Sequence, residues 1–142
     1  MAPRILNGST ELKAAIGEHL GYSDWMEITQ ERVNQFAEAT GDHQWIHIDV
    51  ERAKKESPFG GPIAHGYLTL SLAPVLLPQV VITTGFSMGV NYGCNKVRFM
   101  SPVPVGAKLR MSATVLNVDA IAGGGQPPYQ PTSETERATK PS

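Results

Sequence analysis

Apolar residues in the first part of the chain recur at helical spacing, between residues that begin or end helices. The first predicted helix runs from residue 9 or 10, whose hydroxyl side chain caps it, to about residue 19. A second predicted helix follows Thr29, which can cap it, and stops at Gly41. Asp49 can cap a short helical turn farther on. The spacing therefore places Asp42 at the end of a helix.

The segment Ile63–Leu77 is so apolar that it has almost no polar face. A helix of this kind has to be buried, because no side of it is suited to water. Pro74 lacks the N–H that would bond to Leu70, so we expect a bend there. Prolines and glycines at positions 58, 60, 61 and 62 separate this helix from the preceding turn.

Farther along, the period of the apolar residues changes from that of a helix to that of a strand. Phe86–Tyr92 and Asn95–Met100 are predicted to be short strands. Ala107–Val118 alternates apolar with polar residues, which predicts a strand with one buried and one wet face. A turn at Pro102–Gly106 lies between two of these strands. Helices followed by an antiparallel meander predict an α+β fold in which a sheet wraps one hydrophobic helix.

The C-terminal segment Gln126–Ser142 has a different composition, with four prolines and no Val, Ile, Leu, Phe or Met. Such a segment contributes little to a core, and the glycines at 123–125 are expected to form a flexible turn before it. We therefore predict one domain over residues 1–122. An irregular or disordered tail is predicted over residues 123–142.

Composition limits the classes of function. The 142 residues, 41% of them apolar, are enough for one domain with one core. A formal net charge of -1 without a basic run gives no footprint for nucleic acid, and no apolar stretch is long enough to cross a bilayer. The single cysteine, Cys94, and the absence of a signal sequence favour the cytoplasm. Gly85, Gly89 and Gly93 have no strand-to-helix transition around them, so no dinucleotide cofactor is predicted.

The candidate chemistry lies in Asp42, His47 and Gly66. Adding water across an activated double bond requires one group to take a proton, one to deliver a proton, and a donor that holds charge on the carbonyl oxygen. Asp42 and His47 can exchange protons, provided that the carboxylate is partly desolvated. Gly66 stands where the apolar helix is expected to begin, so its N–H is suited to a developing negative charge.

Two other interpretations involve neighbouring histidines. His43 and His47 are four residues apart, with acidic residues at 42 and 49, so on a helix they would share a face suited to zinc. Gly41 argues against a helix there and the ligand spacing is poorly defined, so no metal is predicted. His65, next to Gly66, suits a structural hydrogen bond at the helix start, and a direct catalytic role is the alternative.

The sequence also carries a family resemblance. Its motifs are, in order, Phe36–Asp42, His47–Asp49, Gly61–Gly66, Asn91–Gly93, Lys96–Phe99 and Pro102-Val103. Together they resemble the MaoC-like dehydratases, which are (R)-specific enoyl-CoA hydratases with a hot dog fold, over about residues 23–122. In that family further apolar strands would follow, so the resemblance implies that the C-terminal strands of the sheet are missing or altered in this chain. The five-residue step from Asp42 to His47, followed by Ala-His-Gly, is the most specific part of this resemblance.

The resemblance implies a reaction and a substrate. Residues matching Asp42 and His47 would bind one water and add it to a trans-2-enoyl thioester, while the amide of Gly66 would hold the thioester oxygen. The product would be a (3R)-3-hydroxyacyl-CoA. Because hot dog proteins generally pair, the resemblance also implies a homodimer that acts on an acyl-CoA thioester without a cofactor.

Further residues are candidate contacts of the substrate. Lys96 and Arg98 are suited to coenzyme A phosphates, although alternating basic residues on a strand are as often its solvated face. Trp45, His65 and Tyr67 complete the candidate substrate-binding residues, although aromatic residues near a buried helix often belong to the core. Two other functions stay open. One is a thioesterase, because the hot dog fold also supports thioester hydrolysis, and the other is a non-catalytic acyl-thioester-binding subunit that a partner completes.

Overall fold

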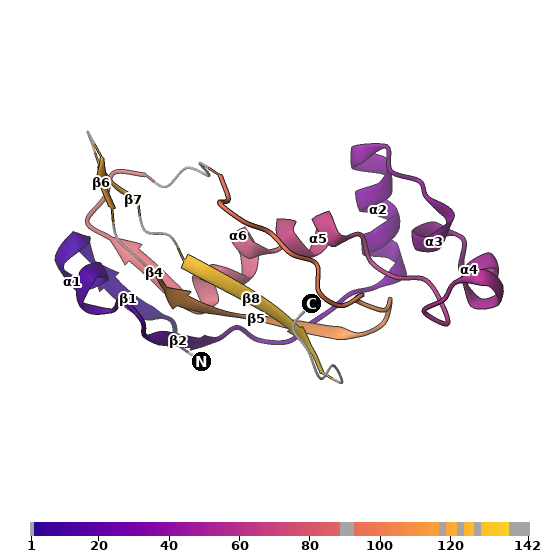
Figure 1. The fold of residues 1–142 in the computed structure, drawn as a ribbon, viewed down its shortest axis with the longest axis horizontal. Helices are drawn as coiled ribbons and strands as arrows, with labels where there is room; N and C mark the ends of the chain where they lie inside the picture. Colours follow the sequence, from indigo (N-terminus) through magenta and orange to yellow (C-terminus); the bar gives the residue numbers. More distant parts are fainter. Residues whose placement is uncertain (1, 89–92, 117–118, 122–123, 127–128, 137–142) are drawn as a thin grey trace. The chain divides into compact units, whose positions relative to one another are not determined.

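The computed structural model covers residues 1–142 and describes all of them except 1, 89–92, 117–118, 122–123, 127–128 and 137–142 (Figure 1). The chain divides into two compact units. The first unit contains Met1–Asp24, Pro74–Arg98 and Met111–Thr132, and the second contains Trp25–Ala73, Phe99–Arg110 and Ser133–Ser142. This division differs from the predicted domain of residues 1–122 with a tail, because the chain returns to each unit more than once.

The first unit is built around two pairs of strands. Strand β1 (Arg4–Asn7) pairs in parallel with β4 (Val81–Thr84), and β2 (His19–Tyr22) pairs antiparallel with β5 (Lys108–Val115), which belongs to this unit from Met111 onward. Helix α1 (Gly8–Ala14) joins β1 to β2. One cluster of buried apolar residues in this unit contains Leu6, Leu12, Ala15, Val81 and Val115.

The first helix is shorter than predicted and ends at Ala14 instead of about residue 19. Gly17 has a φ of 83°, a left-handed conformation that glycine adopts without steric cost. Its N–H donates to the carbonyl of Val115 at 2.7 Å, and His19 then pairs with Thr114 in β2. The chain therefore leaves the helix early to join the sheet.

The second unit contains the helices that surround the candidate site. Helix α2 (Gln30–Thr40) begins and ends as predicted, since Thr29 accepts a hydrogen bond from the N–H of Arg32 and Gly41 closes the helix. One-turn helix α3 (Trp45–Ile48) and helix α4 (Val50–Glu56) follow, and the predicted cap Asp49 accepts from Arg52. Short strand β3 (Met26–Glu27) pairs antiparallel with the start of β5.

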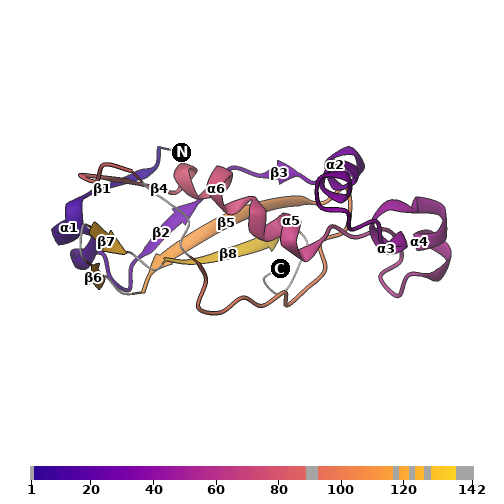
Figure 2. The same cartoon turned by 90° about the horizontal axis from the view of Figure 1, so that it is seen from above.

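The apolar segment after residue 62 forms short helical pieces instead of one long helix (Figure 2). Helix α5 (Gly66–Ser71) is followed by α6 (Ala73–Leu76) and by a 3₁₀ turn, η1 (Leu77–Gln79). The interruption comes just before Pro74, consistent with the missing N–H of proline. Burial on all sides was a wrong prediction for the single chain, since Tyr67 and Val75 are 68% and 53% exposed.

Of the three predicted strands, one is present as expected. Strand β5 (Lys108–Val115) buries Leu109, Met111, Ala113 and Val115, which confirms the alternation of apolar positions. The strands predicted at Phe86–Tyr92 and Asn95–Met100 are absent from their described residues, 86–88 and 95–100, and residues 89–92 lie outside the description. An alternating pattern stabilises a strand only when a core takes its apolar side, and Phe99 and Met100 are about half exposed.

The C-terminal segment is more ordered than its composition predicted. Strands β6 (Asp119–Ile121) and β7 (Gly124–Gln126) pair with each other, and β8 (Tyr129–Thr135) pairs with β5, beside which it runs in Figures 1 and 2. Small polar residues suffice on the buried side of β8, where Ser133 and Thr135 are each 8% exposed. The prediction of an irregular tail is therefore wrong for Tyr129–Thr135, because backbone pairing with β5 replaces the missing apolar side chains.

Among the described residues, we find no helix with the length and apolar character needed to cross a membrane.

Candidate active site

The candidate site lies in the second unit, where the segments after α2, within α3 and before α5 approach one another. A carboxylate oxygen of Asp42 and one ring nitrogen each of His47 and His65 all lie within 4.8 Å of one another. Gly66 follows His65 directly and is the first residue of α5. The structure thus brings Asp42 and His47 together as the sequence predicted, and it adds His65 to them.

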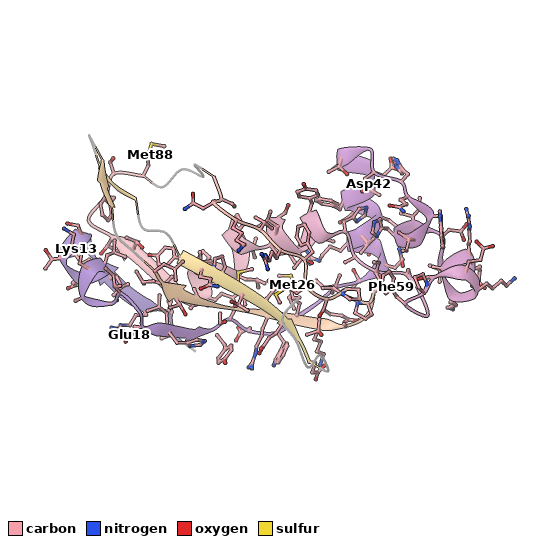
Figure 3. The ribbon with its side chains drawn as sticks, in the orientation of Figure 1. Lys13, Glu18, Met26, Asp42, Phe59 and Met88 are labelled. Carbon is pink, nitrogen blue, oxygen red and sulfur yellow. The ribbon has the colours of Figure 1, made fainter. Side chains whose placement is uncertain are left out.

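Asp42 leaves the end of α2 at a sharp turn (Figure 3). Gly41 has a φ of 83° and donates its N–H to the carbonyl of Ala37 at 2.8 Å, which closes the helix. The Asp42 N–H donates to Thr40 Oγ1, and Asp42 Oδ1 accepts from the N–H of Gln44, both at 3.3 Å. The Asp42 side chain is 51% exposed, so its own chain does not desolvate the carboxylate as general base chemistry would require.

His47 is held on three sides and is 8% exposed. Its N–H donates to the carbonyl of Gln44 at 3.0 Å, and its own carbonyl accepts from Gln30 Nε2 at 2.8 Å. Its ring atom Nδ1 lies 2.7 Å from the carbonyl oxygen of Ile63. Because a carbonyl oxygen only accepts, Nδ1 carries the proton, and Nε2 is left as the proton acceptor of the neutral ring.

His65 is more deeply buried, at 2% exposed. Its Nε2 donates to the main-chain carbonyl of Asp42 at 3.0 Å and lies 3.9 Å from Asp42 Oδ2. Its ring is stacked on that of His47, with centroids 3.9 Å apart and planes inclined by 26°. Phe36 of α2 packs against the same imidazole at a centroid distance of 4.9 Å.

A metal ion is not favoured by the orientation of these groups, although their donor atoms are close. Zinc requires ligand lone pairs that converge on one point about 2 Å from each nitrogen. The lone pair of an imidazole lies in the plane of its ring, and the stacked rings of His47 and His65 have centroids 3.9 Å apart and planes inclined by only 26°, so their lone pairs do not readily converge on one ion. The pair that the sequence suggested for a metal fails for another reason: His43 lies outside helix α3 and binds the carboxylate of Glu38 at 2.7 Å.

Gly66 adjoins an apolar cavity and is covered on one side by an aromatic ring. A Cβ atom at position 66 would lie 2.9–3.1 Å from three ring carbons of Phe99, closer than carbon atoms approach without displacement. The cavity has a volume of about 370 Å³, and Phe59, Met100 and Val103 contribute to its wall. Since the first N–H groups of a helix have no partners within the helix, the site combines a backbone donor with an apolar pocket.

His65 in the site and the exposed His43 outside it have shifted pKa values, in opposite directions. Burial lowers the pKa of His65, and the charge of a protonated His47 would lower it further. The pKa of His43 is raised, chiefly by its hydrogen bond to the exposed carboxylate of Glu38. His65 is therefore a neutral ring at physiological pH, whereas the bond to Glu38 favours the protonated form of His43.

The lowered pKa of His65 predicts that the protein loses stability on acidification. Below the ordinary histidine pKa of about 6.5, the unfolded chain binds a proton at residue 65 that the folded chain resists. The charged groups that act on this ring are Asp42, His43 and His47. Denaturant unfolding measured at pH values from 7.5 to about 5 should show a decline in the free energy of unfolding that is weaker in His65→Phe. If the free energy of unfolding depended on pH equally in the parent and in His65→Phe, the lowered pKa of His65 would be contradicted.

The remaining predicted contacts of the substrate are distributed over both units. Trp45 is partly buried beneath the guanidinium of Arg52, which lies 4.3 Å from the ring centroid. Tyr67 is exposed and meets the ring of Phe99 edge-on at 5.7 Å. Lys96 and Arg98 are exposed and belong to the first unit, whereas the candidate site belongs to the second. Their contact with substrate phosphates stays a prediction.

Two residues of the site were not found from the sequence. Gln30 resembles any polar residue in the first turn of a helix, and its contact with His47 depends on how α2 and α3 pack. Phe99 was placed on a predicted strand, because nothing in its own segment indicates packing on Gly66. No local sequence signal predicts either the contact of Gln30 with His47 or the contact of Phe99 with Gly66.

Comparison with known sequences gives a consistent result. The sequence model described as "MaoC like domain" matches residues 11–129. The 3-hydroxyacyl-thioester dehydratase Z of Mycobacterium tuberculosis is 48% identical over 139 residues, covering 97% of this chain and 91% of that protein. Nodulation protein N of Rhizobium leguminosarum bv. viciae is 42% identical over 137 residues, covering 92% of this chain and 83% of that protein.

Solved structures show the same likeness at the level of the fold. The monoamine oxidase regulatory protein from Archaeoglobus fulgius superposes with a TM-score of 0.78 at 28% identity, covering 96% of this chain and 89% of that chain. The R-hydratase PhaJ1 from Pseudomonas aeruginosa superposes with a TM-score of 0.70 at 23% identity, covering 94% and 78%. These likenesses confirm the predicted hot dog fold, in which an antiparallel sheet is combined with a central helical segment.

Proposed function

Because the chain belongs to the MaoC-like dehydratase family, we propose that it hydrates trans-2-enoyl-CoA to (3R)-3-hydroxyacyl-CoA and catalyses the reverse dehydration. In the forward direction, the water oxygen bonds to C3 and a proton is added to C2. The thioester oxygen carries the negative charge that develops between these two events. The observation that best supports this proposal is that a carboxylate oxygen of Asp42 and a ring nitrogen of His47 lie within 4.8 Å of each other.

That separation suits one water molecule shared by the two side chains. A water that hydrogen-bonds to two groups spans about twice the usual distance of 2.8 Å when the three atoms are nearly in line, and less when they are bent. In our proposal, His47 Nε2 and the carboxylate of Asp42 hold the attacking water, and between them they remove its proton and supply the proton to C2. Dehydration exchanges the two roles, since the same groups then act in reverse order.

Gly66 completes the proposed site. Its N–H, at the start of α5, would donate to the thioester oxygen and stabilise the charge on it. The apolar cavity beside it would take the acyl chain. Trp45 and Tyr67 remain proposed contacts of the substrate, although neither is among the residues that line this cavity. Lys96 and Arg98 remain proposed contacts of the coenzyme A phosphates.

We also propose a homodimer and a cytoplasmic location. The side chain of Asp42 is 51% exposed in the single chain, so the proposed chemistry requires the bound thioester or a second subunit to exclude water from it. Acyl sites built between two subunits would meet that requirement. Sedimentation at increasing protein concentration distinguishes a dimer from a monomer.

The proposed function is tested by incubating the purified protein with trans-2-enoyl-CoA thioesters. We expect the absorbance of the conjugated thioester to fall, and the product to be the (3R) alcohol by chiral analysis. Release of free thiol from a saturated acyl-CoA would favour a thioesterase instead. Binding of the acyl-CoA without turnover would favour a non-catalytic acyl-thioester-binding subunit.

A further inference from the structure

His65 contacts each part of the proposed site although almost none of its surface is exposed. Its ring nitrogen Nε2 holds the main-chain carbonyl of Asp42 at 3.0 Å, and its ring covers that of His47 at a centroid distance of 3.9 Å. Its own carbonyl accepts the first hydrogen bonds of α5, from Leu68 and Thr69. The side chain of His65 thus connects the turn at Asp42 with His47 of α3, and its main chain is part of the start of α5.

The hydrogen bonds of His65 select one form of its ring. The carbonyl of Asp42 only accepts, so Nε2 carries the proton, and Nδ1 of the neutral ring bears a lone pair. Within the described part of the chain, that buried Nδ1 has no hydrogen-bond partner. An unpartnered buried acceptor destabilises a fold, so histidine is a poor choice at this position for packing alone.

We propose that His65 is a positioning residue, which fixes the distance between Asp42 and His47 by tethering the Asp42 turn through Nε2 while its ring supports the His47 ring. This inference rests on the proposed hydration reaction. It also replaces the prediction that His65 binds substrate directly, because a side chain that is 2% exposed and surrounded by Phe36, Asp42 and His47 has no surface for a ligand.

A proton-transferring role for His65 is disfavoured by the same contacts. Its Nε2 proton is held by a main-chain carbonyl, and its Nδ1 faces the protein interior. A second positive ring stacked on a protonated His47 would be repelled at 3.9 Å, so a neutral His65 leaves His47 free to exchange its proton. The chemistry therefore falls to Asp42 and His47, and His65 determines their geometry.

His65→Phe separates positioning from packing. Phenylalanine keeps an aromatic ring against His47 and removes the unpartnered nitrogen, but it cannot donate to the Asp42 carbonyl. We expect its melting temperature to stay within about 5 °C of the parent. We expect its kcat to fall about 10- to 100-fold, because small misplacements of catalytic groups have effects of this size, with KM changed less than about threefold.

Two further variants make the test specific. His65→Gln keeps an N–H donor at a similar reach but has no ring, so it should retain more of the parental kcat than His65→Phe. His43→Phe is the matched control, since this exposed histidine is in the same segment and pairs with Glu38 outside the site. We expect the control to keep the parental kcat.

The ring form of His65 is measured separately, by nitrogen NMR of the histidine side chains in the unliganded protein. We expect Nε2 to be protonated and Nδ1 unprotonated at neutral pH. A parent protein without hydratase activity would refute the proposed function and leave this NMR test of the tether intact. In an active protein, parental kcat in His65→Phe, or activity that simply follows melting temperature across the variants, would refute the positioning role. An NMR spectrum with Nδ1 protonated would refute the tether.

Discussion

His47→Asn is expected to lower kcat for hydration by about 10²- to 10⁴-fold, the usual contribution of a general acid or base. The amide of asparagine can still donate to the carbonyl of Ile63, as Nδ1 does at 2.7 Å, but nothing replaces the lone pair of Nε2. The substitution therefore removes the proton acceptor and keeps the anchor. The measurement is the steady-state rate of loss of the conjugated thioester.

Asp42→Asn should have an effect of similar size, for the same reason. The side-chain oxygen of asparagine can still accept from the N–H of Gln44, so the turn after α2 is preserved while the negative charge is lost. Melting temperatures near that of the parent would show that both variants are folded. Near-parental rates in either folded variant would overturn the assignment of the site.

Gly66→Ala is expected to lower both stability and activity. The added Cβ would lie 2.9 Å from Phe99 Cγ, so the ring or the helix start has to move, and overpacking of this kind typically costs about 1–3 kcal/mol. Phe99 is 48% exposed, which allows it to swing outward and places the cost toward the lower part of this range. Displacement of the amide at Gly66 should reduce kcat/KM about 10- to 100-fold.

The effect of Gly66→Ala on the free energy of unfolding should change sign, from destabilising to stabilising, when Phe99 is first replaced by alanine. The three atoms nearest to that Cβ all belong to the Phe99 ring, so removing the ring relieves the clash with it. Alanine in place of a glycine whose backbone angles it can adopt stabilises by about 0.4–1 kcal/mol. A double-mutant cycle of unfolding free energies should therefore show a coupling of about 0.5–3 kcal/mol between positions 66 and 99. We expect Gly66→Ala/Phe99→Ala to regain the activity of Phe99→Ala alone. Additive effects on stability would show that Phe99 does not determine the need for glycine.

The parts of the fold that sequence predicted best are those with local signals. Thr29 and Gly41 bound α2 because a hydroxyl cap and a left-handed glycine act on their own helix, whatever packs around it. The alternation in β5 was equally informative, since one side of that strand is consistently buried. These signals do not depend on distant parts of the chain.

Elements whose state depends on distant partners were predicted less well. Asn95–Met100 has the pattern of a strand, yet its described residues have no strand pairing and lie exposed. In β8 the composition is unfavourable, but β5 provides a backbone partner, and this pairing decides the outcome. In both segments the presence or absence of a neighbouring strand outweighed the intrinsic propensity of the residues.

The site itself was partly predictable. The motif that contains Asp42 and His47, together with the glycine at 66, identified three positions that the structure brings into one unit. The stacking of His65 on His47 and the packing of Phe99 on Gly66 could not be predicted, because each depends on side-chain contacts between separate segments. Sequence therefore indicated the groups that we propose to react, and the structure added the residues that hold them in place.

The most direct test of the proposed chemistry is a crystal structure of the Asp42→Asn variant with an enoyl or hydroxyacyl thioester bound. The account predicts that the thioester oxygen accepts from the N–H of Gly66 and that C3, or its hydroxyl, lies beside residue 42 and His47 Nε2. A thioester bound in the apolar cavity with its C3 remote from both side chains would contradict it.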